Sequence, residues 1–355
     1  MNKKKIIKII TIILAVVLIC AGSFGGYILY RFNFNAPKDL AHSYDEIYNQ
    51  EQITYDVGDD GEFLVLKIND THFYNGTCEN DVKTMSALEI ILDGTPCDFI
   101  VVNGDMVDGF NLNPDYDKYG ATKIFADLVD SYNTPWTFVP GNNDSEIDGE
   151  NEDLIAYLMQ YKNFVCGNKR NIDGDMQFFV DLEYNGELAH SLAFMDSHAR
   201  TVKAIGEYDY IKENQVNWLL SGIEERKVKT SVFFHMNTPA FKTAFENGDA
   251  YTDNGFPSAY VYELDTITEN KLFDDMTKEN EYISLISIGH VHSNNMCHFY
   301  NGRYYQLSSV SGYNASHPED MIPSCTLTVI DVTETNPQEM YEFEKRTVIP
   351  YLVDG

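Results

Sequence analysis

The sequence DFIVVNGDMVD, residues 98–108, is a short apolar run that ends abruptly in a polar cluster. An apolar run of this length is typical of a strand that is buried on both faces of a sheet. Similar runs occupy 63–68 and 136–140, and helical periodicity fills the intervals at 81–94 and 119–132. This order of elements predicts a βαβαβ unit, which is a buried sheet flanked by helices.

The second half of the chain continues with strands and becomes purely β towards its end. Apolar runs predict strands at 177–184, 192–197, 231–235 and 282–290, and a helical pattern occupies 212–225. Further runs, with no helical pattern between them, follow at 296–300, 303–310, 325–332 and 341–349. We therefore expect an α/β fold in which two sheets form a sandwich with helices on the outside.

The N-terminus carries an apolar segment with the length of a membrane anchor. Residues 9–30 hold no charge, and 22 residues at about 1.5 Å each can cross a bilayer core of roughly 30 Å. Basic residues in 1–8 precede this segment and an acidic chain follows, which predicts a cytoplasmic tail and an extracytoplasmic remainder in the cell membrane. We assign 31–60 to a stalk and 61–355 to the folded domain. The alternative is a cleaved signal peptide, which would leave the protein secreted.

Charge and cysteine content exclude several classes of protein. Beyond residue 31, the chain carries 20 Lys and Arg against 55 Asp and Glu. A surface of this charge repels nucleic acid phosphates, so we expect no nucleic-acid partner. Five cysteines follow the apolar segment without a CxxC pair, which excludes a disulfide scaffold and a zinc knuckle and leaves one or two disulfides open. We expect the exported part to be monomeric.

Five of the predicted strands end in polar residues that suit metal binding, and ligands of open α/β sheets sit beyond the carboxyl ends of strands. These residues are Asp70, His72, Asp105, Asn142, His235, His290 and His292. Two residues apart in an extended segment, Asp70 and His72 would project to one side. Oxygen and nitrogen ligands without a thiolate suit two ions of manganese, iron or zinc better than calcium or magnesium.

The motifs at these strand ends are D-x-H, G-D-x-x-D, G-N-x-D, H and G-H-x-H. In type and order they resemble those of the calcineurin-like metallophosphoesterase superfamily. The segments GNNDSE, YDYIKENQVNWL, FFHMNTPAF and NKLFDDM are similar to the single-domain group related to purple acid phosphatases. The resemblance covers roughly residues 62–335. It implies an αββα sandwich, with two mixed sheets flanked by helices, that holds a dinuclear metal centre.

The resemblance also implies the role of each ligand. The first metal ion would be held by Asp70, His72 and His292, the second by Asn142, His235 and His290, and both would be bridged by Asp105. Asp108 stands where the family carries an acid beyond the ligands. The tyrosine ligand that gives purple enzymes their colour is missing there, so no purple absorption band is expected.

Leaving-group protonation is where the sequence departs from the family. Paired metal ions lower the pKa of a bridging water, and the resulting hydroxide attacks phosphorus opposite the leaving oxygen. The family normally reads G-N-H-D in the third motif, where the histidine stabilises the transition state or protonates the leaving group. This chain has Asn143 there, before Asp144, and an amide delivers no proton at neutral pH. His198 is the candidate proton donor in place of the family's histidine. The candidate catalytic residues are therefore Asn143, Asp144 and His198.

Because every metal position is retained, the sequence favours a working phosphoesterase with altered protonation of the leaving group. Two alternatives stay open: a membrane-anchored protein that binds metal and phosphorylated ligands without turnover, and a fold in which the polar clusters are ordinary turns. The substrate stays open among monoesters, diesters, nucleotides and lipid headgroups. The long polar segment 236–280 and the aromatic residues Phe110, Tyr116, Tyr119 and Tyr313 either line a pocket or pack on one another.

Overall fold

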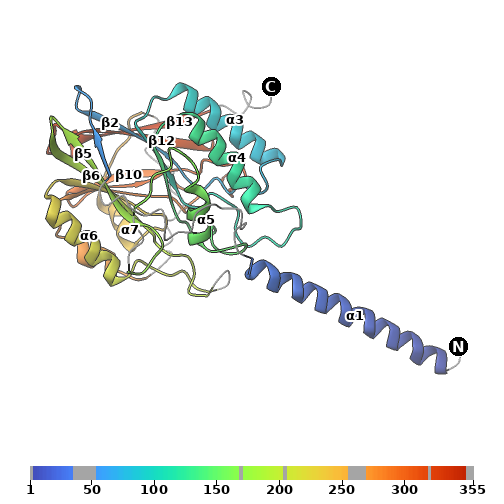
Figure 1. Ribbon diagram of the computed structural model, residues 1–355. Coiled ribbons are helices and arrows are strands. Elements are labelled where there is room, and N and C mark those ends of the chain that lie inside the picture. The colour runs from blue at the N-terminus through green and yellow to red at the C-terminus, as the bar shows by residue number, and fades with distance from the viewer. Residues whose placement is uncertain are drawn as a thin grey trace.

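The computed structural model describes residues 3–34, 53–167, 171–202, 206–254, 269–318 and 321–348. Two β-sheets pack face to face, and helices cover their outer faces (Figure 1). Both sheets contain parallel and antiparallel neighbours. The expected α/β sandwich of two mixed sheets flanked by helices is therefore confirmed.

The smaller sheet contains the βαβαβ unit that the sequence predicted. Its strand order is β13-β12-β2-β3-β4. The strands are β2 (Glu62–Ile68), β3 (Phe99–Asn103), β4 (Trp136–Val139), β12 (Ser324–Asp331) and β13 (Tyr341–Thr347). The three strands β2, β3 and β4 run parallel, and α3 (Glu79–Gly94) and α4 (Lys118–Ser131) connect them. All three carboxyl ends therefore meet at one edge of the sheet.

The larger sheet has the strand order β1-β5-β6-β7-β9-β11-β10-β8. Its strands are β1 (Ile53–Asp56), β5 (Gln177–Tyr184), β6 (Glu187–Met195), β7 (Lys229–Phe233), β8 (Asp249–Ala250), β9 (Ile283–Ile288), β10 (Met296–Tyr300) and β11 (Arg303–Leu307). The outer face carries α6 (Glu213–Arg226), α7 (Pro239–Asn247) and α8 (Leu272–Thr277), whose buried residues form one apolar cluster with the sheet. Two short helices, α5 (Asn151–Leu158) and α9 (Pro337–Met340), complete the fold.

An aromatic cluster joins the two sheets in the core. Phe194 of β6 stacks on Phe178 and Phe233, with ring centroids 4.8 and 5.2 Å apart. Across the sandwich it meets Phe99 of β3 at 5.9 Å. Aromatic pairs add about 0.5–1.5 kcal/mol each to the gain from burying their area. The apolar runs that predicted the strands therefore also supply the contact that holds the sheets together.

Two expectations differ from the structure, and a third point concerns the disulfides that the sequence left open. The long polar segment 236–280, for which the sequence predicts no helix or strand, contains α7, β8 and α8, while 255–268 lies outside the described residues. The expected stalk, 31–60, includes strand β1, which pairs with β5 at the sheet edge, while 35–52 lies outside the described residues. All six cysteines are free, so neither of the disulfides left open by the sequence is formed.

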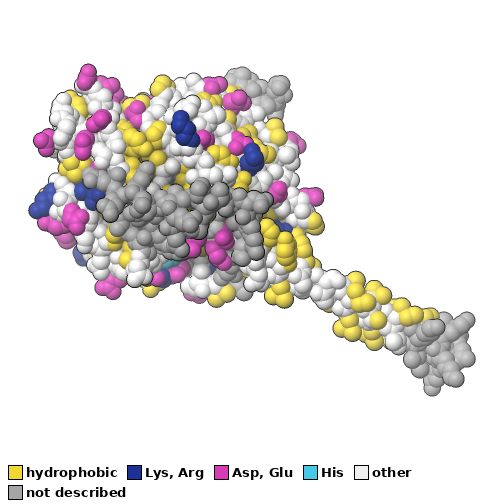
Figure 2. Space-filling view, in the orientation of Figure 1, with side chains coloured by type: hydrophobic (Ala, Val, Ile, Leu, Met, Phe, Trp, Pro, Cys, Tyr) yellow, Lys and Arg dark blue, Asp and Glu magenta, His cyan; other side chains and the backbone are white. Residues whose placement is uncertain are grey.

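The N-terminal helix α1 (Lys3–Phe32) projects away from the sandwich (Figure 1). Its stretch Ile9–Phe32 is long and apolar enough to cross a membrane, with a mean hydropathy of 2.5, and a signal sequence has the same properties. Figure 2 shows apolar side chains uncovered along this helix. An exposed apolar helix of this length fits a bilayer better than water.

The buried histidine His190 of β6 gives the fold a pH dependence. Its Nε2 lies 2.9 Å from Oγ of Ser231, and burial, with a smaller effect of Lys229, lowers the pKa of His190 to about 3. Between this value and the ordinary pKa of about 6.5, the folded protein binds fewer protons than the unfolded chain. The contribution of the neutral His190 ring to the free energy of unfolding is therefore fully present above about pH 6.5, and it is lost as the pH falls towards 3.

Replacing His190 by Gln should therefore flatten the pH dependence of stability. As the pH falls below about 6.5, the free energy of unfolding should decrease in both proteins or stay level in the variant. The decrease in the native protein should be steeper than in His190→Gln by up to about 1.4 kcal/mol per pH unit. Urea unfolding between pH 7 and pH 4 measures both slopes. Parallel slopes would show that His190 does not couple folding to protonation.

Candidate metal centre

The carboxyl ends of β2, β3, β7 and β9 bring candidate ligands together in two groups. The first group is Asp70, His72, Asp105 and His292, and the second is Asp105, His235 and His290. In each group the ligand atoms lie within 4.8 Å of one another. Six of the seven predicted ligands therefore converge, although they are spread from residue 70 to residue 292.

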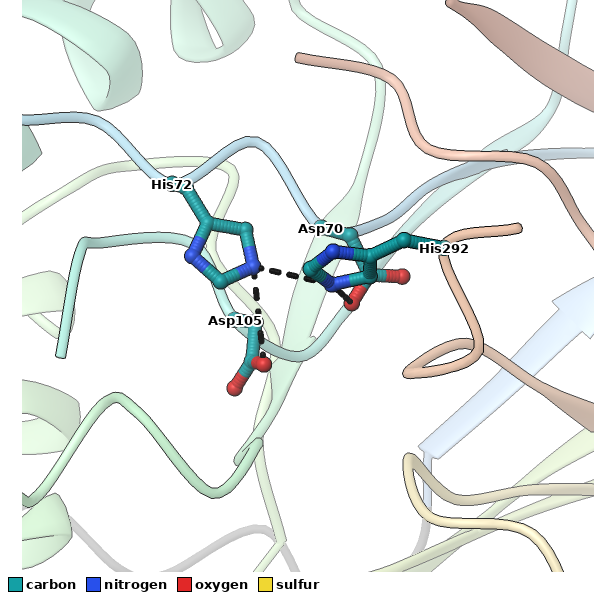
Figure 3. Close-up of side chains that lie close together, drawn as sticks. All are labelled: Asp70, His72, Asp105 and His292. Carbon is teal, nitrogen blue, oxygen red and sulfur yellow. Dashed lines mark hydrogen bonds and ion pairs between the residues drawn. The ribbon is translucent and has the colours of Figure 1, made fainter. Parts of the chain in front are cut away.

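The first group points its nitrogen and oxygen atoms at a common centre (Figure 3). Nε2 of His72 and Nε2 of His292 are 3.1 Å apart. Nε2 of His292 is 3.2 Å from Oδ1 of Asp70, and Nε2 of His72 is 3.6 Å from Oδ2 of Asp105. Two ring nitrogens and two carboxylates thus face each other over distances that a single cation could bridge.

The second group shares Asp105 with the first. Nε2 of His235 lies 3.2 Å from Oδ2 of Asp105 and 3.3 Å from Nδ1 of His290. The same oxygen, Oδ2, lies 3.6 Å from Nε2 of His72 in the first group, so the Asp105 carboxylate contacts histidines of both groups. A carboxylate in this place has two oxygens with which to contact two neighbouring cations.

Backbone carbonyl groups determine which ring nitrogens face the centre. Nδ1 of His235 lies 2.9 Å from the carbonyl of Asn103, and Nδ1 of His292 lies 3.0 Å from the carbonyl of Ser316. A carbonyl accepts hydrogen bonds only, so Nδ1 must carry the proton in both rings. In a neutral ring, Nε2 then directs its lone pair at the carboxylates, which is the arrangement that metal-binding histidines use.

Asn142 supplies an independent test of whether a metal ion fits. Its side chain is buried, and Oδ1 has no hydrogen-bond partner. A buried amide oxygen without a partner costs about 1–3 kcal/mol, so such atoms are rare in folded proteins. Gly141 and Asn143, which flank Asn142, both contact Asp105, so this oxygen would be available to a cation held there. The residues present therefore fit a metal ion.

Charges within the centre depend strongly on one another. Burial alone would raise the pKa of Asp70, but His235 and His292 lower it to about 2. Burial would lower the pKa of His235, but Asp105 and Asp70 raise it to about 10. Burial and the neighbouring His235 lower the pKa of His290 to about 3, which leaves this ring neutral. The buried carboxylates thus need positive charge beside them, which a proton or a metal ion can supply.

The backbone at the ligand positions is left-handed. Asp70, His72, Asp105 and His290 have φ angles of 53°, 48°, 49° and 70°. Residues other than glycine seldom adopt such angles, and those that do cluster at functional sites. The expectation that Asp70 and His72 lie in an extended segment is therefore wrong, and their side chains converge because of tight turns.

Glycine is required where two of these turns touch. A Cβ on Gly104, whose φ is 86°, would lie 2.2 Å from Nδ1 of His235. A Cβ on Gly141 would lie 2.3 Å from Oδ1 of Asp105. Both contacts are far shorter than van der Waals distance, so any side chain there would push the ligands apart.

Asp144 holds the two loops around Asp105 in place. Its Oδ2 accepts hydrogen bonds from the backbone N–H groups of Asp105 at 2.9 Å and Gly141 at 2.8 Å, and its Oδ1 accepts from Val107. Burial and the nearby Asp105 raise the pKa of Asp144 to about 6. This carboxyl acts on the backbone, which gives it a positioning role.

Asn143 lies against the shared carboxylate. Its backbone N–H donates to Oδ1 of Asp105 at 2.8 Å, and its Nδ2 donates to Oδ2 of Asp105 at 3.0 Å. Nδ2 is also 3.4 Å from Nδ1 of His72. The side chain at position 143 therefore borders the centre, so the replacement of the family's histidine falls beside the candidate metal ligands.

His198, the candidate proton donor, is held away from the two ligand groups. Nε2 of its ring lies 2.8 Å from Oε1 of Gln215 in α6, and its backbone N–H donates to Asp196. His198 follows a predicted strand, but this position does not bring its ring to the metal centre. The backbone turns at His198, with a φ of 66°, and directs the ring towards α6. Among the described residues, His198 has no contact with a candidate ligand.

Sequence reasoning missed a polar cluster next to the centre. The ring of Tyr208 packs edge-on against His290, with centroids 5.2 Å apart, and its hydroxyl accepts a hydrogen bond from Arg200 at 2.9 Å. Nε of Arg200 is 3.2 Å from Oε1 of Glu146. The sequence feature that indicates this cluster is Arg200, two residues after His198, because arginine commonly binds phosphate.

Three of the four aromatic residues proposed for a pocket lie around the junction with the N-terminal helix. Tyr116 and Tyr119 line a cavity of about 320 Å³ between the sandwich and the end of α1. Phe110 packs on Phe32 of α1 with centroids 5.8 Å apart. The backbone N–H of Tyr313 is bound by Thr84. Phe110, Tyr116 and Tyr119 therefore surround the junction with the N-terminal helix.

Comparisons with known proteins show the family to which this chain is related. Residues 63–294 match the family model described as calcineurin-like phosphoesterase. In Arabidopsis thaliana, the probable inactive purple acid phosphatase 14 is 27% identical over 45% of this chain and 46% of its own length. The probable inactive purple acid phosphatase 29 is 22% identical over 77% of this chain and 78% of its own. The chain thus spans about half of the first relative.

Among solved structures, a dimetal phosphatase from Danio rerio aligns with 80% of this chain and 98% of its own. The two share 10% sequence identity, with a TM-score of 0.49. The resemblance to the group related to purple acid phosphatases is confirmed by the names of the relatives.

Proposed function

The chain belongs to the calcineurin-like phosphoesterase family, and on this basis we propose that it hydrolyses a phosphate ester at a dinuclear metal centre. The observation that carries the proposal is the pair of ligand groups that share Asp105. We also propose that α1 anchors the chain in the cell membrane, with a cytoplasmic N-terminus and the sandwich outside.

Each side chain has a proposed role in this centre. One ion would be held by Asp70, His72, Asp105 and His292, and the other by Asp105, Asn142, His235 and His290. Two ions of manganese, iron or zinc would supply Lewis acidity and an activated water at neutral pH. Asn143 would donate an amide hydrogen bond to a phosphate oxygen. It offers no proton, so the leaving oxygen must depart as a stable anion or take its proton from solvent.

A second candidate function is binding without turnover. Two observations favour it: Asn143 stands where the family carries histidine, and two relatives are named probable inactive purple acid phosphatases. The intact ligand set favours the enzyme, because a chain that only binds a phosphorylated ligand does not need two groups that converge on one carboxylate.

Metal titration of the full chain separates the candidates. Protein stripped with a chelator should bind two Mn²⁺ ions per chain and then release p-nitrophenol from p-nitrophenyl phosphate. Calorimetry gives the stoichiometry and absorbance gives the rate, with chelated protein as the control. Two bound ions without release would support the binding protein, and no bound metal would contradict both proposals.

A further inference from the structure

The C-terminal end of α1 is in direct contact with the sandwich. The guanidinium of Arg31 forms a bidentate ion pair with the carboxylate of Asp148. Its Nε lies 2.5 Å from Oδ1, and its Nη2 contacts Oδ2. The backbone N–H of Asp148 donates to the carbonyl of Arg31, and the hydroxyl of Tyr27 donates to the carbonyl of Leu112. Both charged side chains are buried, so this contact fixes where α1 meets the domain.

This contact places the sandwich directly on the membrane surface. Arg31 is the first charge after the uncharged residues 9–30, and those 22 residues span little more than a bilayer core. The outer surface of the membrane must therefore lie next to Arg31. Tyr27, Tyr30 and Phe110 lie at this level, where aromatic side chains are enriched in membrane proteins.

The same junction borders the metal centre. Phe32 of α1 packs on Phe110, whose backbone N–H donates to Glu146 at 2.6 Å. The neighbouring Gly109 approaches Asn143 so closely that a Cβ would lie 2.4 Å from its Oδ1. Asn143 in turn bonds Asp105. The path from the membrane helix to the shared carboxylate therefore passes through few residues, and all of them are in contact.

From this geometry we propose that the substrate is a lipid of the same membrane whose headgroup carries a phosphoanhydride. The inference rests on the proposed function and adds the substrate class. A lipid of this membrane reaches the rim of the centre laterally, because the junction that borders the centre lies at the membrane surface. Because Asn143 supplies no proton, the leaving group should be stable as an anion, and a phosphate is a far better anion than an alkoxide.

The proposed step is a balanced hydrolysis. The oxygen of water forms a bond to the terminal phosphorus, and the bond from that phosphorus to the bridging oxygen breaks. The lipid departs as a phosphomonoester anion, inorganic phosphate is released, and the excess proton goes to solvent. The chain's own proton donors are not needed.

Tryptophan quenching tests the orientation without relying on activity. Phe110→Trp and Ile90→Trp are compared in the full chain, reconstituted in phosphatidylcholine vesicles that contain lipids brominated near the headgroup. Both positions are about equally exposed, at 46% and 42%, and Ile90 lies near the end of α3, at the sheet edge opposite the metal centre.

The signal of the unsubstituted chain is subtracted from that of each variant. The fluorescence added by Phe110→Trp should be quenched several-fold more than the fluorescence added by Ile90→Trp, because only position 110 lies at the membrane surface. Equal quenching would overturn the orientation.

The substrate class is tested in the same vesicles after loading with Mn²⁺. Diacylglycerol diphosphate, phosphatidic acid and soluble ADP are compared by phosphate release, with p-nitrophenyl phosphate as the reference. Confinement to one surface should make the lipid diphosphate react about 10²-fold faster than ADP at equal bulk concentration. It should also react faster than phosphatidic acid, which differs only in its leaving group.

Each outcome separates the inference from the proposed function. If p-nitrophenyl phosphate is hydrolysed while ADP reacts as fast as the lipid diphosphate, the lipid inference is overturned and the phosphoesterase stands. If phosphatidic acid reacts as fast as the diphosphate, the leaving-group argument fails. If none of the four compounds is hydrolysed, the catalytic premise fails and the lipid substrate with it, while quenching still decides the orientation.

Discussion

Replacing Asp105 by asparagine is expected to abolish metal-dependent hydrolysis. Asp105 is the one residue that belongs to both ligand groups, so its charge acts on both candidate metal positions. The variant loses several kcal/mol of transition-state stabilisation, so its rate should be at least about 10³-fold lower. Calorimetry should show fewer than two Mn²⁺ ions bound per chain, and p-nitrophenyl phosphate should be turned over at the background rate.

Asp108→Asn is the matched control, because it makes the same change three residues further on. Asp108 belongs to neither ligand group: its Oδ1 lies 3.9 Å from Nδ1 of His72, whereas Nε2 of that ring faces the other ligands, and its side chain is 37% exposed. Mutating a residue that contacts a metal ligand without binding the metal lowers metal affinity or activity by about tenfold at the lower end of the usual range. Circular dichroism of the metal-free variants separates lost ligation from lost folding. Equal losses in both variants would contradict the special role of Asp105.

Restoring the family's histidine with Asn143→His should raise turnover on poor leaving groups. An imidazole at this position would border Asp105 and His72, as the amide does now, and could protonate an alkoxide. General acid catalysis is worth about 10²–10⁴-fold, or roughly 3–5 kcal/mol. Alkyl phosphates such as glycerol 3-phosphate should gain by about this factor, and p-nitrophenyl phosphate should gain little because nitrophenolate leaves without a proton.

The ratio of the two rates is the informative measurement. It cancels any general change in metal affinity or folding, because both substrates use the same loaded protein. Asn143→Gln serves as the control, since it changes the size of the side chain without adding a group that titrates near neutral pH. Equal gains on alkyl and aryl phosphates would exclude a role for position 143 in protonating the leaving group.

The sequence predicted the fold because its strongest signals are local. The runs at 63–68 and 98–103 correspond to β2 and β3, since a strand buried on both faces must be apolar along its length. Weak local signals were missed: β1 has four residues and depends on pairing with β5 at an edge, and α5 has eight residues. Short elements owe their stability to their neighbours in space, which periodicity does not report.

The sequence by itself determined which polar residues follow the strands and in what order, because strand ends are marked by composition. The direction in which those side chains point was decided by the tertiary structure. Left-handed turns aim Asp70, His72 and Asp105 at one another, and His198 turns away towards Gln215. The carbonyl of Asn103 fixes the tautomer of His235 from 132 residues away. Contacts of this range depend on the packed chain, and so does the docking of α1 beside the metal centre.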